Sequence, residues 1–225
     1  MAYIFNGASL QNGQQSNMDS LLIKHLEIDG KAVLLGVVCD GVGSLAGGAF
    51  AAGTAVQMLN KWFNTLTNTD RLGLMMRDSV LDINSKIISE ALAMGIETAS
   101  TMSALLLIEE KFYIVHIGDS RIYSYGNEVL SLLTKDDISE TGRLNAYIGR
   151  YAGIVPQYLE GSAKGKTFLI CSDGLYKRMD TNFMKAKLKS WNKRSLDEPI
   201  KSLPQYVVEQ GEQDNISLAI IKIER

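Results

Sequence analysis

Hydrophobic residues occur along the chain in short runs that are broken by Gly, Asp or Asn, a pattern typical of strands joined by tight turns. The turn Asp29-Gly30 separates runs at residues 21–28 and 32–39, which predicts a hairpin. A second hairpin is predicted at residues 102–108 and 112–117. Further strands are predicted at residues 122–125, 128–133, 167–171 and 216–223.

Helical periodicity lies between and after these hairpins. Small residues at 43–53 lead into a helix that continues to about Phe63, and in residues 72–94 hydrophobic side chains recur every three or four positions. Gly95 follows and is a typical helix terminator. Two more helices are predicted near these ranges: 182–191 and 200–210. The order is strands, two helices, strands, helices and a strand, which favours an α+β layered fold over βαβ alternation.

The composition argues against several classes of protein and of site. A length of 225 residues fits one domain, residues 1–225, with 46% hydrophobic residues to form its core. The 23 basic residues nearly balance the 25 acidic ones, which argues against a nucleic-acid partner. No apolar run is long enough to span a membrane, and the N-terminus lacks a signal-peptide pattern, so we expect a cytoplasmic protein with no membrane partner. Two Cys and two His are too few for a four-Cys or three-His zinc site.

Aspartates stand at the ends of several apolar strands. Asp40, Asp119 and Asp173 each follow such a strand, and Asp214 precedes the last one. Each alone reads as an ordinary turn residue, but strands of one sheet can bring their ends together. Clustered carboxylates need a compensating cation, and oxygen ligands suit Mg²⁺ or Mn²⁺. Gly41 would let a backbone carbonyl approach the same ion.

These residues lie in motifs, and the ordered set resembles that of the metal-dependent serine/threonine protein phosphatases of type 2C (the PPM family), in its small bacterial form. The motifs that carry the resemblance are Asp40-Gly41-Val42-Gly43, Gly118-Asp119-Ser120-Arg121, Ser172-Asp173-Gly174-Leu175 and Asp214-Asn215. They come in the family's order and span almost the whole chain.

The resemblance implies two mainly antiparallel β-sheets flanked by α-helices, with a flap-like segment at about residues 134–165. It implies hydrolysis of phosphoserine and phosphothreonine in proteins by direct attack of a metal-bridging hydroxide. Asp40 would bridge two Mn²⁺ or Mg²⁺ ions, with the Gly41 carbonyl on one of them. Asp173 and Asp214 would hold the other ion, and Asp119 would correspond to a ligand of a third. A cognate serine/threonine kinase is the expected partner.

The chain also departs from the family pattern. Its segment Q-Q-S-N-M-D stands where the family has R-x-x-N-E-D, so Gln14 replaces an Arg that binds the substrate phosphate, and Met18 replaces a metal ligand. Asp19 is retained, and with Asn215 it would support the ligands from outside. Asp137 replaces a His of the flap. These changes leave open an alternative, a phosphatase-like binding or regulatory module with little or no turnover.

Other polar residues in the strands have structural interpretations. We expect His116 to be a hydrogen-bonded core residue, Arg121 to form a structural salt bridge, and Cys39 and Cys171 to be buried in strands rather than to act as nucleophiles. The segment from Gly41 to Ala46 also fits the dinucleotide fingerprint G-x-G-x-x-A, but a second helix follows where a βαβ unit needs a strand.

Overall fold

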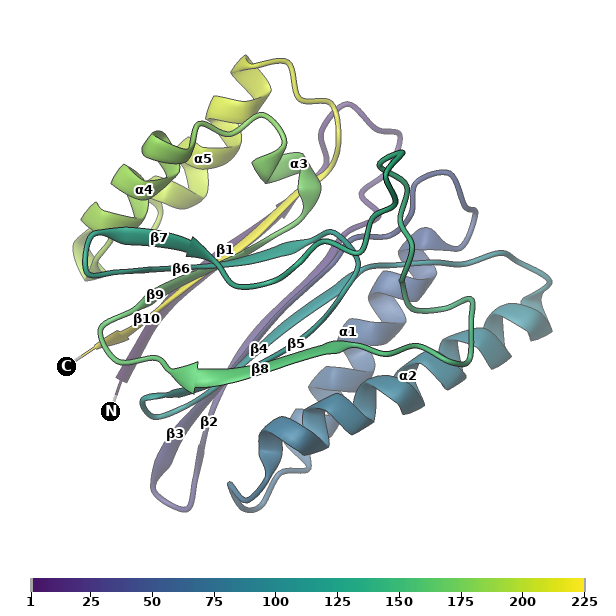
Figure 1. The fold of residues 1–225 in the computed structure, drawn as a ribbon, viewed down its shortest axis with the longest axis horizontal. Helices are drawn as coiled ribbons and strands as arrows, with labels where there is room; N and C mark the ends of the chain where they lie inside the picture. Colours follow the sequence, from purple (N-terminus) through teal and green to yellow (C-terminus); the bar gives the residue numbers. More distant parts are fainter. Residues whose placement is uncertain (1, 225) are drawn as a thin grey trace.

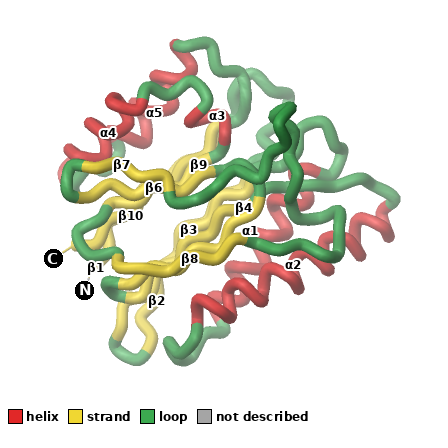
Figure 2. Tube along the Cα trace, viewed as in Figure 1, coloured by secondary structure: helices red, strands yellow, loops and turns green. Residues whose placement is uncertain are grey.

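The computed structural model describes residues 2–224, whose strands form two five-stranded sheets that lie face to face (Figure 1, Figure 2). Every strand pair in both sheets is antiparallel. Sheet A contains, in spatial order, β1 (Ala2–Leu10), β10 (Ile216–Glu224), β9 (Thr167–Cys171), β6 (Arg121–Gly126) and β7 (Val129–Leu132). Sheet B contains β2 (Ser20–Ile28), β3 (Lys31–Cys39), β4 (Met102–Ile108), β5 (Lys111–Ile117) and β8 (Gln157–Ser162).

Helices cover the outer face of each sheet, so the layers run helix, sheet, sheet, helix (Figure 1). The helices on sheet B are α1 (Gly48–Asn64) and α2 (Leu72–Met94), and α2 ends at Gly95 in the left-handed conformation, as predicted. The helices on sheet A are α4 (Thr181–Ser190) and α5 (Glu198–Glu209), with a 3₁₀ turn at Lys193–Ser195 between them and the short α3 (Asp173–Tyr176) before them. The predicted layered α+β fold is confirmed.

Apolar side chains fill three interfaces between these layers. Leu34, Leu105, Phe168 and Ile221 belong to the cluster between the two sheets, and each is fully buried. The small residues of α1 allow that helix to lie close on sheet B, where Ala51, Ala52 and Ala55 are buried. A third cluster joins sheet A to α4 and α5.

The register of the strands brings the predicted site residues to one end of the sandwich. In sheet B, Ser20 pairs with Cys39. In sheet A, Cys171 pairs with Arg121 on one side and with Leu218 on the other. The loops that carry the predicted aspartates therefore leave the two sheets at a common end. Ala2 and Glu224 pair at the opposite end of sheet A.

Four elements were not predicted from the sequence, namely β1, β8, α3 and the 3₁₀ turn at Lys193–Ser195. The segment 134–165, in which no strand was predicted, contains β8 and an isolated bridge between Ile138 and Leu144, and a second bridge joins its Ile148 to Ser100. The first predicted helix begins at Gly48, after a turn of small residues.

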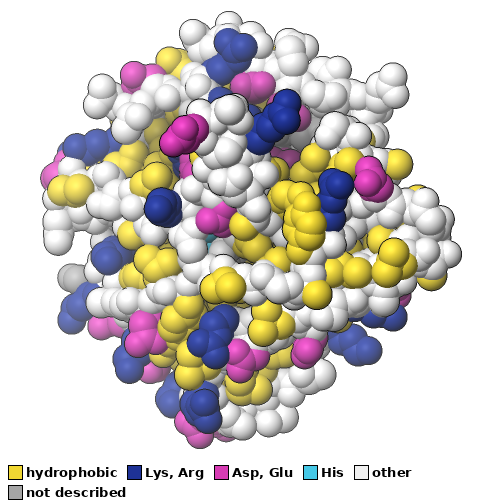
Figure 3. Space-filling view, turned by 45° about the vertical axis from the view of Figure 1, so that its right-hand side comes forward, with side chains coloured by type: hydrophobic (Ala, Val, Ile, Leu, Met, Phe, Trp, Pro, Cys, Tyr) yellow, Lys and Arg dark blue, Asp and Glu magenta, His cyan; other side chains and the backbone are white. Residues whose placement is uncertain are grey.

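Within residues 2–224, no helix is both long enough and apolar enough to cross a membrane. On the face drawn in Figure 3, Lys and Arg are interspersed with Asp and Glu, and hydrophobic side chains lie between them. This mixture of charges agrees with the nearly balanced composition.

Candidate active site

Asp40 lies directly after β3 and is held by the segment that precedes β4. Its backbone N–H donates to Thr101 Oγ1 at 3.0 Å, and its carbonyl accepts from Thr101 N at 2.9 Å and from Ser100 Oγ at 3.0 Å. Thr101 Oγ1 also hydrogen-bonds Ser120 Oγ at 2.6 Å. One threonine thus joins the loop of Asp40 to the turn that carries Asp119.

Asp173 is the first residue of α3 and is separated from β9 by Ser172 alone. Its neighbour Gly174 lies against the segment before β10, where an added Cβ would be 2.1 Å from Asn215 O. Gly41 is similarly confined, because a Cβ there would be 2.5 Å from the carbonyl carbon of Gly48. The two glycines therefore let main-chain segments from different elements approach beside Asp40 and Asp173.

Asp214 and Asp19 complete the group from the starts of β10 and β2. Asp214 accepts from the N–H of Asn215 at 2.9 Å, and its own N–H donates to Glu212 Oε1 at 3.0 Å. Asn215 Nδ2 donates to Ser16 O at 3.0 Å, which ties this loop to the N-terminal segment that precedes Asp19.

Four carboxyl groups of this cluster have a raised pKa, and the charge of Asp173 contributes to the rise at each of them. Burial is the main cause at Asp40, followed by the charges of Asp19, Asp173 and Asp119, and together they raise its pKa well above the usual value. Burial and the charges of Asp173 and Asp214 raise the pKa of Asp19 to about 6. Burial and Asp173 raise the pKa of Asp119 to about 6 and also raise that of Asp214. Five aspartates that are distant in sequence therefore form one electrostatic unit.

A cleft opens beside this cluster. Its volume is about 600 Å³, and its lining includes Asp40, Gly41, Asp214, Gln14 and Met18. The predicted substrate-binding residue Gln14 is exposed at this cleft, and Met18 is half-buried there.

The donor atoms of the cluster fit a hard divalent cation. Asp19 Oδ2, Asp173 Oδ1 and Asn215 Oδ1 are buried and have no hydrogen-bond partner in the structure. Buried carboxylate oxygens without partners are costly, and a cation would satisfy them. Among residues 2–224, no three Asp, Glu, His or Cys side chains are already arranged around one ion position. The described residues therefore supply unpartnered oxygens but no preformed coordination shell.

The protein phosphatase 2C family model matches residues 6–207. The chain belongs to the protein phosphatase 2C family. The serine/threonine phosphatase stp of Listeria welshimeri is 27% identical to this phosphatase over 213 residues, which cover 83% of each protein.

Solved structures share the fold of this phosphatase. The structure of serine/threonine phosphatase Stp1 from Staphylococcus aureus superposes with a TM-score of 0.90 at 18% identity and covers 100% of this chain and 96% of its own. The catalytic domain of the phosphatase PstP, solved in complex with two manganese ions, gives a TM-score of 0.86 at 22% identity and covers 99% of each chain.

The segment that follows β7 in this phosphatase is tied to the turn of Asp119. The N–H of Gly118 donates to Asp137 Oδ2 at 3.0 Å, and the N–H of Asp137 donates to Gly118 O at 2.8 Å. Asp137 thus anchors the start of this segment. Arg121 pairs with Asp136 at 2.7 Å, and its guanidinium carbon lies 3.7 Å from the centre of the Tyr176 ring. The predicted structural role of Arg121 is confirmed.

The other polar residues of the strands also behave as predicted. His116 is buried, with Nδ1 hydrogen-bonded to Ser103 Oγ at 2.8 Å and Nε2 to Gly118 O at 3.1 Å. Burial raises the pKa of the Cys39 and Cys171 thiols, both of which are free and fully buried. Neither cysteine has the exposed, electropositive surroundings of a nucleophile.

Sequence reasoning missed Lys177. Its ammonium forms an ion pair with Asp173 Oδ2, and its backbone N–H donates to Asp173 O at 3.0 Å. The signal was the spacing, since Asp and Lys four residues apart lie on one face of a helix. That signal was hidden because no helix was predicted between the strand at residues 167–171 and the helix at residues 182–191.

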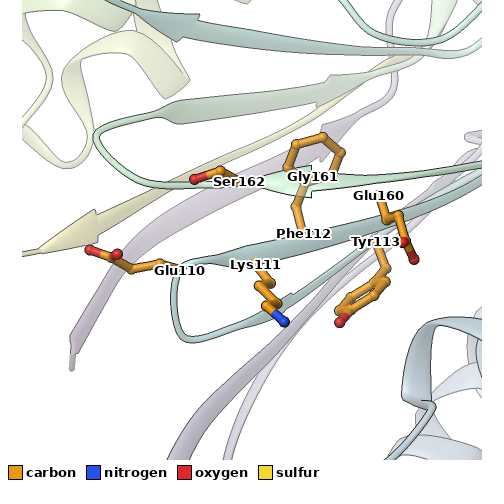
Figure 4. A pocket seen from close by; sticks show the side chains of 7 residues that line it. All are labelled: Glu110, Lys111, Phe112, Tyr113, Glu160, Gly161 and Ser162. Carbon is orange, nitrogen blue, oxygen red and sulfur yellow. The ribbon is translucent and has the colours of Figure 1, made fainter.

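A second hollow of about 450 Å³ lies along β5 and β8 (Figure 4). Tyr113 and Glu160, which are paired in the sheet register, both line it. None of the five clustered aspartates contributes to its lining. It is therefore separate from the acidic cleft.

Proposed function

We propose that the acidic cleft is the catalytic centre and that Asp40, Asp173 and Asp214 hold its divalent ions. Family membership makes the chain a serine/threonine protein phosphatase whose substrates are phosphoproteins, and metal dependence is general to this family. The observation that carries the assignment is Asp173 Oδ1, a buried and unpartnered carboxylate oxygen within the cluster of aspartates.

We propose supporting roles for the other residues of the cluster and the cleft. The Gly41 carbonyl would share the ion held by Asp40, and Asp119 would bind a third ion at the edge of the cluster. Asp19 and Asn215, both buried, would orient the ligands and their waters from behind. Gln14, exposed at the cleft, would donate a neutral hydrogen bond to the phosphate where the family has a charged one.

When bound, the ions supply a nucleophile at neutral pH and screen the charge on the phosphoryl oxygens. The protein positions the carboxylates that would bind these ions. Thr101 and Ser100 fix the main chain of Asp40, and the Asn215 contact to Ser16 fixes the loop of Asp214, so neither carboxylate has to be reorganised during the reaction.

We further propose that residues 1–225 act as one catalytic domain with residues 134–165 as its flap, and that Mn²⁺ or Mg²⁺ fills the site. The two manganese ions of the PstP structure support the choice of ion. Two free buried cysteines suit a reducing compartment, which supports cytoplasmic action on proteins phosphorylated by a cognate serine/threonine kinase. The alternative of an inactive binding module is not favoured, since the aspartate cluster is retained and the Listeria relative is a phosphatase.

Hydrolysis of a phosphothreonine peptide, with Mn²⁺ titrated from zero, tests the assignment. Asp173→Asn and Asp40→Asn should each lower turnover by about 100-fold or more, because each removes a charged ligand. Asp82→Asn is the matched control, since Asp82 is exposed on α2 and does not line the cleft. Wild-type turnover in either cleft variant, with the fold intact by circular dichroism, would contradict the assignment.

A further inference from the structure

Lys177 places a positive charge within the group of carboxylates that is proposed to bind metal. Its Nζ is paired with Oδ2 of Asp173, while Oδ1 of the same carboxylate is buried and unpartnered. The charge also reaches Asp119 and Asp214, where it opposes the rise in their pKa. The lysine thus partly neutralises the carboxylates that divalent ions would neutralise.

The exposure of the two side chains allows Lys177 to leave its ion pair with Asp173. The Asp173 side chain is only 12% exposed, whereas the Lys177 side chain is 54% exposed. An ammonium on a flexible stem can turn into water at little cost, but the buried carboxylate cannot follow it. Asp173 would therefore exchange one cation for another.

We propose that Lys177 is a tethered cation that competes with divalent metal for Asp173, so that release of the lysine helps to set the metal affinity. The inference rests on the proposed role of Asp173 as a metal ligand. An ion that binds Asp173 through Oδ2 has to displace Nζ, and an ion on the adjacent oxygens is repelled by the ammonium as long as it stays.

A merely structural salt bridge would have a different signature. If Lys177 only stabilised α3, its removal would weaken the folded protein with and without metal and would leave metal affinity unchanged or lower. A competing cation predicts effects of opposite sign. Without metal the carboxylates lose their counter-ion and the protein becomes less stable, whereas metal binding becomes tighter.

Isothermal titration with Mn²⁺ in the absence of substrate separates these possibilities. Lys177→Met keeps the apolar stem and removes the charge, and it should lower the Mn²⁺ Kd about fivefold or more. Lys177→Arg keeps a cation and should stay within about twofold of wild type. Lys86→Met is the matched control, because Lys86 is 53% exposed and pairs with Glu90 four residues along α2.

Thermal unfolding of the same proteins gives the second readout. Lys177→Met should have a lower Tm than wild type in chelator and a larger rise in Tm on adding Mn²⁺, and Lys86→Met should show neither change. An Mn²⁺ Kd in Lys177→Met equal to or weaker than wild type would overturn the proposal, as would equal tightening in Lys177→Arg.

Asp173→Asn distinguishes this inference from the proposed function. If Asp173→Asn loses Mn²⁺ binding and Lys177→Met binds Mn²⁺ no more tightly than wild type, only the competition by Lys177 is refuted. If Asp173→Asn binds Mn²⁺ as wild type does, the ligand assignment itself is wrong.

Discussion

Gln14 and Met18 are the two side chains at which the cleft differs most from the family pattern. Both line the cleft beside Asp40. Gln14 can donate hydrogen bonds but carries no charge, and the Met18 thioether is a poor ligand for Mg²⁺ or Mn²⁺. Weak substrate and metal binding is the expected consequence, and turnover is expected to persist because the aspartates are retained.

Substitution of Met18 tests whether the residue at this position affects metal binding. Met18→Glu should lower the Mn²⁺ concentration for half-maximal turnover about tenfold, because it adds a carboxylate beside Asp40. Met18→Leu keeps the residue apolar and should leave the requirement unchanged. Turnover measured across an Mn²⁺ titration decides the matter, and an unchanged requirement in Met18→Glu would place residue 18 outside the metal site.

At the scale of elements, the cleft depends on close crossings of main chain. The start of α3 passes the segment before β10 at Gly174, and nothing larger fits between them. This crossing sets Asp173 beside Asp214, so the short helix positions the two carboxylates.

Gly174→Ala should therefore destabilise the protein by about 1–3 kcal/mol and reduce turnover, because the methyl group would be 2.1 Å from Asn215 O. Gly153→Ala is the control, since a Cβ at Gly153 meets nothing within 4 Å. Urea unfolding in chelator measures both. Equal stability of the two variants would rule out the close approach.

Helices and strands with a strong hydrophobic periodicity were predictable from the sequence, whereas those with a weak periodicity were not. The buried strand Lys31–Cys39 and the helix Leu72–Met94 have patterns that only one structure satisfies. Strands β1 and β8 lie at sheet edges, are mostly half-buried or exposed, and lack clear alternation. The aspartates were found because each lies in a local motif, whereas Lys177 acts through the geometry of a four-residue helix.

For the whole molecule, the shared charge of the cleft links stability to pH. Burial, with Asp173 and Asp214, raises the pKa of Asp19 from 3.8 to about 6. The folded protein thus holds this proton more tightly than the unfolded chain. The stabilising contribution is complete below pH 3.8 and is lost as the pH rises through about 6.

In chelator, the free energy of unfolding of the wild type should fall relative to that of Asp19→Asn between pH 4 and pH 7, by about 3 kcal/mol at most. Saturating Mn²⁺ should reduce this difference, because the cation replaces the proton as the partner of the carboxylates. Urea unfolding of both proteins at a series of pH values measures the effect. Parallel pH curves in chelator would contradict it.

The five clustered aspartates come from both sheets. Asp19 and Asp40 adjoin strands of sheet B, Asp173 and Asp214 adjoin strands of sheet A, and Asp119 lies where the chain crosses from β5 to β6. Ions bound by several of these aspartates would link the two sheets to each other. The same oxygen atoms would then bind the catalytic ions and join the two sheets at that end. Metal binding and the stability of the sandwich would therefore be thermodynamically linked.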